Sequence, residues 1–233
     1  MKICSYLLCF VLVFYSCQSI KTSTLFLENG ISKELAVYRK SQVLNVSYDL
    51  SFEIPKEKEL PIISQLALKV NLGTIQEPLY LDFNEKKENL KSVIVNGKMV
   101  VILHEKEHLI IPKEYLIKGH NLVEVYFIAG DLSLNRSDDF LYTLLVPDRA
   151  STLFPCFDQP DIKAAYTLSI TAPKGWSVLA GAPLSKKIEL GDFVRYQFEQ
   201  SDQMSTYLFS FVAGGFKSIS KNVDYFSMTF LFR

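Results

Sequence analysis

Hydrophobic and polar residues alternate strictly along several stretches of the chain. Between residues 43 and 54, an apolar residue occupies every second position, with polar or acidic residues between. The apolar residues of this stretch are Leu44, Val46, Tyr48, Leu50, Phe52 and Ile54. Because successive side chains of a strand point to opposite faces, the pattern predicts a half-buried antiparallel strand. The same period recurs at residues 66–72, 123–127 and 166–170.

Further short strands are expected where β-branched and aromatic residues cluster between turn residues. These strands cover residues 79–83, 92–95, 193–199, 206–212 and 225–232. Turn sequences such as "VNGK", "APKGW" and "LGD" separate them, and only "PKEYLIKG" at 112–119 has helix start and stop residues. The chain is therefore predicted to be all-β, as one domain or as two closely packed β-layers.

The stretch "HEKEH" matches the His-Glu-x-x-His pattern of zinc metalloproteases. On a helix, His104 and His108 would lie one turn apart and could share a zinc ion, with Glu105 beside the bound water. The flanking residues instead favour strands, because β-branched residues precede the motif and a proline follows it closely. Four residues along a strand would separate the imidazoles by roughly 13 Å. We therefore predict two strands joined by a charged turn over residues 105–107, and no metal site.

The first residues of the chain have the composition of a secretory signal. A basic start is followed by an apolar run from Ile3 to Tyr15, which is too short to span a bilayer comfortably. The run ends in Ser16-Cys17, which resembles the lipobox of bacterial lipoproteins, where the cysteine is acylated. The alternative is a plain secretory signal cut near Ser16. We predict a lipoprotein-type signal peptide over residues 1–16, a lipid on Cys17, a mobile linker over residues 17–34, and attachment to a membrane of the cell envelope.

Charge and cysteine content argue against nucleic-acid binding, an internal disulfide and a catalytic cysteine. Twenty-five basic and twenty-five acidic residues cancel, so nothing points to nucleic acid as a partner. Of the four cysteines, two lie inside the signal and Cys17 would carry the lipid, which leaves Cys156 without a disulfide partner. Because Cys156 stands between aromatic residues and prolines in "LFPCFDQP", we expect a buried structural thiol and not a nucleophile.

A long motif follows from residue 148. It reads "DRASTLFPCFDQPDIKAAYTLSITAPKGWSVLAGAPL", and a second motif, "MSTYLFSFVAGGFKSI", lies downstream. Both motifs resemble the N-terminal domain of the aminopeptidase N family of zinc metallopeptidases. The upstream stretches 43–54, 80–83, 93–97 and 119–127 fit the same domain, so the resemblance spans about residues 35–233. The residues that carry the resemblance are Phe154, Pro155, Cys156, Asp158, Pro160, Lys163, Ala164, Pro173, Trp176, Ala180, Pro183, Ser205, Thr206, Tyr207, Leu208, Phe211 and Gly214.

None of these motif residues has a catalytic pattern. We expect Asp158 and Lys163 to pair with each other or to cap turns, and Phe154, Phe157 and Tyr166 to lie in the core. The motif is therefore interpreted as structural.

The resemblance implies a fold and a partner. The fold is a twisted, saddle-shaped antiparallel β domain, similar to a β-sandwich, which leans on a separate thermolysin-like catalytic domain. In the family, that second domain carries the zinc ion, a helical His-Glu-x-x-His motif and a Gly-x-Met-Glu-Asn segment that holds the free amine of the substrate. No Met-Glu-Asn occurs in this sequence, so no zinc or other cofactor is expected in this chain. One family position faces the substrate, and counting without gaps places it at Val146.

Three functions can be weighed on this basis. The first is the non-catalytic N-terminal β domain of an exported zinc aminopeptidase, in a truncated or split form, which helps to shape the peptide site of a catalytic domain. The second is a free-standing β-sandwich module of the envelope that binds a peptide or a glycan. The third is a self-contained metalloprotease that uses His104, Glu105 and His108. The sequence favours the first, so the chain alone is expected to be inactive.

Overall fold

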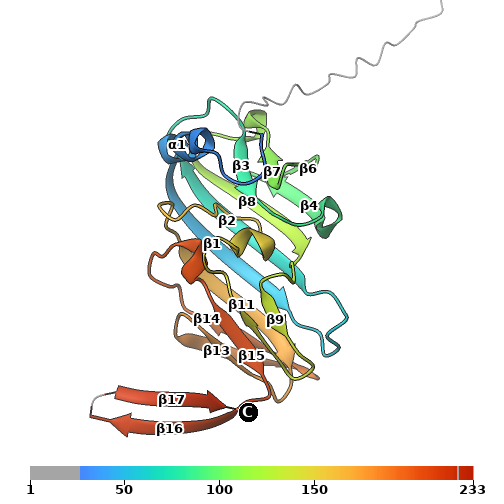
Figure 1. Cartoon of the computed structure of the whole chain (residues 1–233), viewed down its shortest axis with the longest axis vertical. Coiled ribbons are helices and arrows are strands. Elements are labelled where there is room, and N and C mark those ends of the chain that lie inside the picture. Colours follow the sequence, from blue (N-terminus) through green and yellow to red (C-terminus); the bar gives the residue numbers. More distant parts are fainter. Residues whose placement is uncertain (1–26, 225, 233) are drawn as a thin grey trace, which may run out of the picture.

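The computed structural model describes residues 27–224 and 226–232, and its fold is built mainly from strands (Figure 1). The predicted signal peptide and Cys17 lie outside the described residues. A twisted sheet of eight strands runs through most of the length of the molecule. In spatial order its strands are β13 (Leu184–Leu190), β14 (Phe193–Phe198), β11 (Ala165–Pro173), β1 (Val43–Glu53), β2 (Ile63–Leu72), β8 (Gly119–Ile128), β4 (Leu90–Val95) and β5 (Lys98–Val100). The all-β prediction is confirmed.

The large sheet is antiparallel except at one pair of strands. β1 runs parallel to β11, with Ser47 opposite Ala165, whereas its other neighbour, β2, is antiparallel to it. A parallel pair needs a long crossover, and here the chain between the two strands forms most of the remaining strands. The predicted antiparallel arrangement is therefore correct apart from this pair.

A smaller sheet packs against one face of the large sheet and closes a common core. Its strands, in spatial order, are β12 (Ser177–Ala180), β15 (Phe211–Gly214), β10 (Phe140–Thr143) and β9 (Leu134–Arg136). The rings of Phe52 on β1 and Phe211 on β15 lie 5.2 Å apart, and both side chains are buried. The inward positions predicted at 66–72, 123–127 and 166–170 are all buried as expected.

Leu44 is the exception to the predicted pattern of β1. The pairing of β1 with β2 shifts register between Val43 and Asn45. As a result Val43 takes the inward position and is 8% exposed, whereas Leu44 is 65% exposed. A β-bulge of this kind reverses the face of a side chain without changing the sequence pattern.

A third sheet lies beside a helix at the end of the molecule where the described chain begins (Figure 1). Its strands are β3 (Leu79–Asp82), β7 (His108–Ile111) and β6 (Leu103–Glu105). The helix, α1 (Lys33–Gln42), was not predicted, and the Ser32 side chain accepts a hydrogen bond from the backbone N–H of Leu35 at its start. No helix in the described part of the chain has the length and apolar character needed to cross a membrane.

Two predicted elements differ from the structure. The helix expected at 112–119 is a single 3-10 turn, η2 (Lys113–Tyr115), after which β8 begins at Gly119. The strand expected at 206–212 starts as another 3-10 turn, η4 (Thr206–Leu208), and only β15 continues it. The two remaining 3-10 turns are η1 (Lys87–Asn89) and η3 (Ala150–Thr152).

The last described residues form a separate hairpin. Its strands, β16 (Lys217–Val223) and β17 (Phe226–Phe232), pair only with each other. The hairpin projects from the lower end of the molecule in Figure 1. The predicted strand at 225–232 is confirmed in β17.

Candidate functional site

The "HEKEH" stretch forms a tight hairpin between β6 and β7. Lys106 and Glu107 have φ angles of 49° and 67°, the left-handed conformation of a two-residue hairpin turn. Glu105 lies opposite His108, and His104 lies opposite Leu109. The predicted strand–turn–strand structure is confirmed.

The two histidines of the hairpin point to opposite faces of the small three-stranded sheet. His104 lies within hydrogen-bonding distance of the backbone oxygen of Phe83, at 2.8 Å. His108 is fully buried on the other face, with Nδ1 2.9 Å from Asp82 Oδ1 and Nε2 3.2 Å from the backbone oxygen of Glu28. The sequence analysis attributed the separation of the two imidazoles to the length of a single strand. That reason is wrong, because the chain folds back between the two histidines. The rings are kept apart because they lie on opposite faces of the sheet.

These residues do not fit a zinc site. Zinc in a metalloprotease needs two imidazole nitrogens on the same side, within about 2.1 Å of one ion. Among the residues that the structure describes, no group of three His, Cys, Asp or Glu side chains could hold a metal ion.

His108 belongs to a buried ionic cluster around Asp82. The Arg39 guanidinium, which is fully buried, donates to both oxygens of this carboxylate at 2.7 and 2.8 Å, and it also donates to the backbone oxygen of Tyr80. His108 Nδ1 lies beside the same carboxylate, 2.9 Å from Asp82 Oδ1, without the alignment of a hydrogen bond. The cluster joins α1, β3 and β7.

The sequence prediction missed this cluster. Asp82 occupies an inward position in the apolar strand "LYLDF", and a charged residue there requires a buried partner. The charged residue in an apolar strand was thus the one sign of a buried ionic cluster in the sequence, although it does not identify Arg39 as the partner.

The aminopeptidase-like motif forms a structural junction and not a catalytic site. Asp158 Oδ2 accepts from the backbone N–H of Ser151, and its Oδ1 accepts from the Thr206 hydroxyl, at 2.9 and 2.8 Å. Its own N–H donates to Asp82 Oδ2 at 2.9 Å. Asp158 thus caps turns as predicted, but its partners are Ser151 and Thr206, and Lys163 is exposed.

The pKa values of the two buried carboxylates move in opposite directions. Burial alone would raise the pKa of Asp82, but the charges of Arg39 and His108 hold it below the usual value. Burial raises the pKa of Asp158, and the hydrogen bonds from Ser151 and Thr206 offset this only in part. The difference follows from the cationic partners, which only Asp82 has.

Cys156 lies at the same junction and is fully buried. Its backbone pairs with that of Asp82 through hydrogen bonds of 2.7 and 3.0 Å. Burial raises the pKa of the Cys156 thiol well above its usual range, so the thiolate form needed by a nucleophile is disfavoured. The structural role predicted for Cys156 agrees with this environment, and Phe154, Phe157 and Tyr166 lie in the core as predicted.

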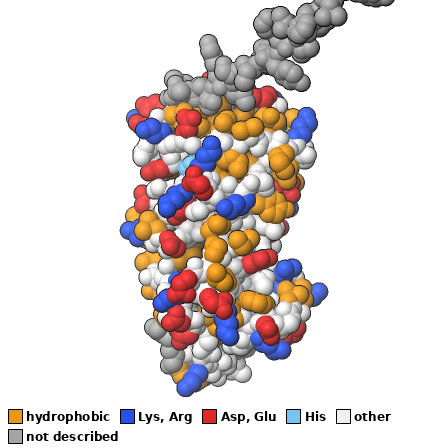
Figure 2. All heavy atoms as spheres, turned by 90° about the vertical axis from the view of Figure 1, so that its right-hand side faces the viewer, with side chains coloured by type: hydrophobic (Ala, Val, Ile, Leu, Met, Phe, Trp, Pro, Cys, Tyr) orange, Lys and Arg blue, Asp and Glu red, His pale blue; other side chains and the backbone are white. Residues whose placement is uncertain are grey.

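Val146 lies in the connection that follows β10 and is 54% exposed. It continues an exposed alternating row with Tyr142 and Leu144. Across the small sheet, Tyr142 lies opposite Val212 on β15, and Val212 lies opposite Leu179 on β12. We call these five residues the outer apolar face. Figure 2 shows one side of the molecule, on which hydrophobic side chains reach the surface among scattered acidic and basic groups.

The C-terminal hairpin has a second apolar surface. One of its faces carries large hydrophobic side chains that are between 39% and 58% exposed, together with the exposed lysines Lys217 and Lys221. The hydrophobic residues are Ile219, Val223, Met228, Phe230 and Phe232. The opposite face carries Ser218, Ser220, Asn222 and Thr229, and Leu231 is a hydrophobic residue on this mainly polar face. The hairpin is therefore amphipathic but has no apolar layer of the described chain paired with it.

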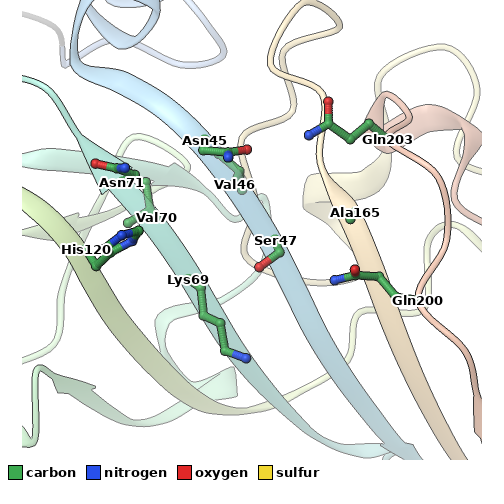
Figure 3. Close-up of a pocket in the computed structure, with 10 residues that line it drawn as sticks. All are labelled: Asn45, Val46, Ser47, Lys69, Val70, Asn71, His120, Ala165, Gln200 and Gln203. Carbon is green, nitrogen blue, oxygen red and sulfur yellow. The ribbon is translucent and has the colours of Figure 1, made fainter.

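A polar concavity of about 350 Å³ lies on the solvent side of the large sheet (Figure 3). Strands β1, β2, β8 and β11 form its floor, and the loop before η4 forms one wall. Its polar lining side chains are Asn45, Ser47, Lys69, Asn71, His120, Gln200 and Gln203. We refer to it as the amide pocket. Sequence reasoning did not predict it, because its residues come from five separate segments.

Comparison with known proteins places this fold in a family. Residues 34–208 match the family described as the Peptidase M1 N-terminal domain. "Glutamyl aminopeptidase" of Homo sapiens is 43% identical over 76 residues, which cover 32% of this chain and 8% of that protein. "Probable aminopeptidase 1" of Sulfurisphaera tokodaii is 30% identical over 136 residues, which cover 56% of this chain and 17% of that protein.

A third relative extends the match along the chain. "Leucyl aminopeptidase" of Saccharolobus solfataricus is 25% identical over 168 residues, which cover 72% of this chain and 20% of that protein. The chain thus spans one fifth or less of each of these three relatives. With the match over 34–208 and the strand architecture, the chain belongs to the family of Peptidase M1 N-terminal domains.

Proposed function

We propose that this chain is the non-catalytic β domain of an exported M1 aminopeptidase. In this proposal it packs against a thermolysin-like catalytic domain, which is either joined to it or supplied as a separate chain, and it helps to shape the peptide site. The observation that carries the proposal is the outer apolar face in a domain of this family.

The outer apolar face has the composition of a buried interface. An antiparallel sheet with one face in a core normally presents polar side chains on its other face. Here the outward positions in register across β12, β15 and β10 are Leu179, Val212 and Tyr142. Leu179 and Tyr142 are exposed, and Val212 between them is half-buried. Exposed and contiguous apolar residues of this kind are typical of interaction surfaces, and permanent interfaces are more hydrophobic than transient ones.

The C-terminal hairpin supports the same proposal. It lies beyond residue 208, where the family match ends. A two-stranded hairpin with one apolar face is marginally stable alone in water, and it gains stability when a hydrophobic layer covers that face. A catalytic domain that covered both the hairpin and the outer apolar face would bury both surfaces.

Catalysis is assigned to the partner domain. His104, Glu105 and His108 do not fit a zinc site, because His104 Nε2 and both ring nitrogens of His108 face oxygen atoms of this chain. The contribution of this chain would be a wall of the substrate pocket, and Val146 is the proposed residue because it is exposed at the margin of the outer apolar face.

Export and membrane attachment complete the proposal. The signal-like residues and Ser16-Cys17 support secretion followed by acylation of Cys17. Peptide N-termini would then be processed at the cell envelope, through the catalytic domain.

Interface variants test the proposed packing. The chain, carrying an affinity tag, is isolated from its own cells, and polypeptides that contain the His-Glu-x-x-His and Gly-x-Met-Glu-Asn motifs are identified by mass spectrometry. If the catalytic polypeptide is a separate chain, Tyr142→Asp with Leu144→Asp should abolish its recovery. If the two are joined, the same change should expose the linkage to limited proteolysis. Met99→Asp is the matched control, because Met99 is 71% exposed and lies on β5, outside this face.

The proposal fails if no polypeptide with these motifs is joined to or recovered with the wild-type chain. The role of the outer apolar face fails if the double variant behaves as the Met99→Asp control does.

A further inference from the structure

We infer that the amide pocket binds a neutral, hydroxyl-rich ligand, that is, a carbohydrate. The pocket lies on the face of the large sheet that is turned away from the small sheet, whereas the outer apolar face lies on the small sheet itself. A ligand in the pocket and a catalytic domain on the outer apolar face could therefore be bound together. The inference does not depend on the proposed aminopeptidase function.

The polar side chains of the pocket surround a central area of the sheet where the side chains are small. Figure 3 shows Gln200 and Gln203 extending from their loop toward β1, where Asn45 and Ser47 lie. Asn71 and His120 border the other side of the same hollow. Small side chains at Ser47 and Ala165 leave the centre open, so that a ligand can approach amide groups from two sides.

Four amide side chains of the pocket have unused hydrogen-bonding capacity. Within the described chain, the side chains of Asn45, Asn71, Gln200 and Gln203 make no hydrogen bond to another residue. Asn121, by contrast, bonds to the backbone of Ile117 and Gly119 and to the side chain of Asn96. A primary amide both donates and accepts, as does each hydroxyl of a sugar, so amides can bind neighbouring hydroxyls in pairs.

The charge of the pocket does not favour an ionic ligand. Its ionisable lining residues are Lys69 and His120. The Asp49 carboxylate interacts electrostatically with Lys69 and offsets its charge. Anion sites use several cationic groups or paired guanidinium donors, which this hollow does not provide.

The topology of the sheet disfavours an extended peptide as the ligand. β11, β1, β2 and β8 are all interior strands of the eight-stranded sheet, and from Ser47 onward β1 is paired with β11 on one side and β2 on the other. A peptide that binds by strand addition needs a free sheet edge and apolar pockets for its side chains. The valines that line the hollow, Val46 and Val70, are 3% and 1% exposed, and offer almost no apolar surface.

The expected affinity is weak. Among the described residues, no Phe, Tyr or Trp side chain lines the hollow, so the large stacking platform that strengthens many sugar sites is missing there. For a ligand of one to two sugar rings bound by hydrogen bonds, a dissociation constant on the order of 1 mM follows from the usual ligand efficiencies.

Side-chain amide signals measure this binding directly. The 15N-labelled full chain is titrated separately with maltotriose, with chitotriose and with trialanine amide, each to about 20 mM, well above the expected constant. We expect at least one sugar to shift the amide signals of Asn45, Asn71, Gln200 and Gln203 in a saturable way. The amide of Gln65, exposed on β2 outside the hollow, is the internal control and should not move.

Two variants locate the site. Asn45→Ala with Gln203→Ala should weaken sugar binding by about tenfold or more, since two hydrogen-bonding groups are removed. Gln65→Ala should leave it unchanged, and the backbone spectrum of each variant shows that the fold is retained. The inference is overturned if neither sugar moves the four signals, if trialanine amide moves them and the sugars do not, or if the double variant binds sugar as the wild type does.

Discussion

Asp82 is the residue on which the contacts between α1, β3 and β7 converge. Its carboxylate accepts hydrogen bonds from the Arg39 guanidinium and from the backbone N–H of Asp158, and the ring of His108 lies against it. The backbone of Asp82 pairs with that of Cys156. Removing one partner of a buried ion pair leaves the other charge uncompensated, at a cost of about 3–5 kcal/mol. The stability of this end of the domain should therefore depend strongly on one side chain.

Asp82→Asn is expected to lower the free energy of unfolding by about 3 kcal/mol at neutral pH. Because the pKa of Asp82 is lowered in the folded chain, its stabilising contribution is present above the unfolded value near 3.9 and is lost as the pH falls through the folded pKa. Urea unfolding between pH 3 and 7 measures the difference between wild type and variant. A difference that stays constant over this range would contradict the assignment.

Asp158→Asn provides the opposite case at the same junction. The pKa of Asp158 is raised by burial, so the stability linked to its protonation is present at low pH and is lost as the pH rises from about 4 through the folded pKa. The advantage of the wild type over Asp158→Asn should therefore shrink as the pH rises, whereas its advantage over Asp82→Asn should grow. Parallel pH profiles for the two variants would show that the directions are wrongly assigned.

The purified chain is expected to bind no stoichiometric zinc. His104 and His108 lie on opposite faces of their sheet, and His104 Nε2 and both ring nitrogens of His108 face oxygen atoms of this chain. Metal analysis after dialysis against a weak chelator checks this expectation. One tightly held zinc ion per chain that is lost in His104→Ala would contradict the expectation. Lys106→Ala, in the same turn, is the control variant.

At the level of elements, the C-terminal hairpin should drive self-association of the isolated chain. Ile219 and Phe230 lie opposite each other and are 58% and 57% exposed. Changing both to lysine should reduce the associated fraction in sedimentation velocity. Leu44→Lys is the matched control, since Leu44 is 65% exposed but lies on the large sheet. If the control reduces association as much as the hairpin variant, the hairpin is not the surface responsible.

The strands that were predicted correctly are those that have one face in the core and the other face exposed. In β2, Leu66, Leu68 and Val70 all point inward, so the burial pattern is visible in the sequence itself. Helix α1 has no such signal, because two of its three buried residues, Arg39 and Gln42, are polar. Only Ser32 at its start and basic residues in its last turn indicated a helix.

Other elements could not be predicted because distant residues decide them. The exposure of Leu44 depends on a bulge against β2, and the turn at Thr206 is held by a hydrogen bond to Asp158, 48 positions earlier. The amide pocket is similar, since it combines β1, β2, β8, β11 and a late loop. Periodicity reports the local face of an element, but not the partner that this face meets.

At the scale of the whole molecule, attachment to a membrane through Cys17 remains a prediction from the sequence. The apolar run before Ser16-Cys17 fits lipoprotein processing better than a transmembrane anchor. Metabolic labelling with a fatty acid should modify the wild type and not Cys17→Ser. Labelling that persists in the variant, or a mature N-terminus elsewhere, would contradict the prediction.

The central claim of the proposal is that this β domain does not carry the catalytic groups and that a partner domain supplies them. Hydrolysis of aminoacyl p-nitroanilides tests it most directly, with the purified chain assayed alone over a range of zinc concentrations and again with its catalytic polypeptide. We predict no turnover by the chain alone, because no described residues could supply the metal-bound water that the reaction needs. Activity should appear only with the catalytic polypeptide. Turnover by the chain alone, above that of a chain with both His104→Ala and His108→Ala, would contradict the account.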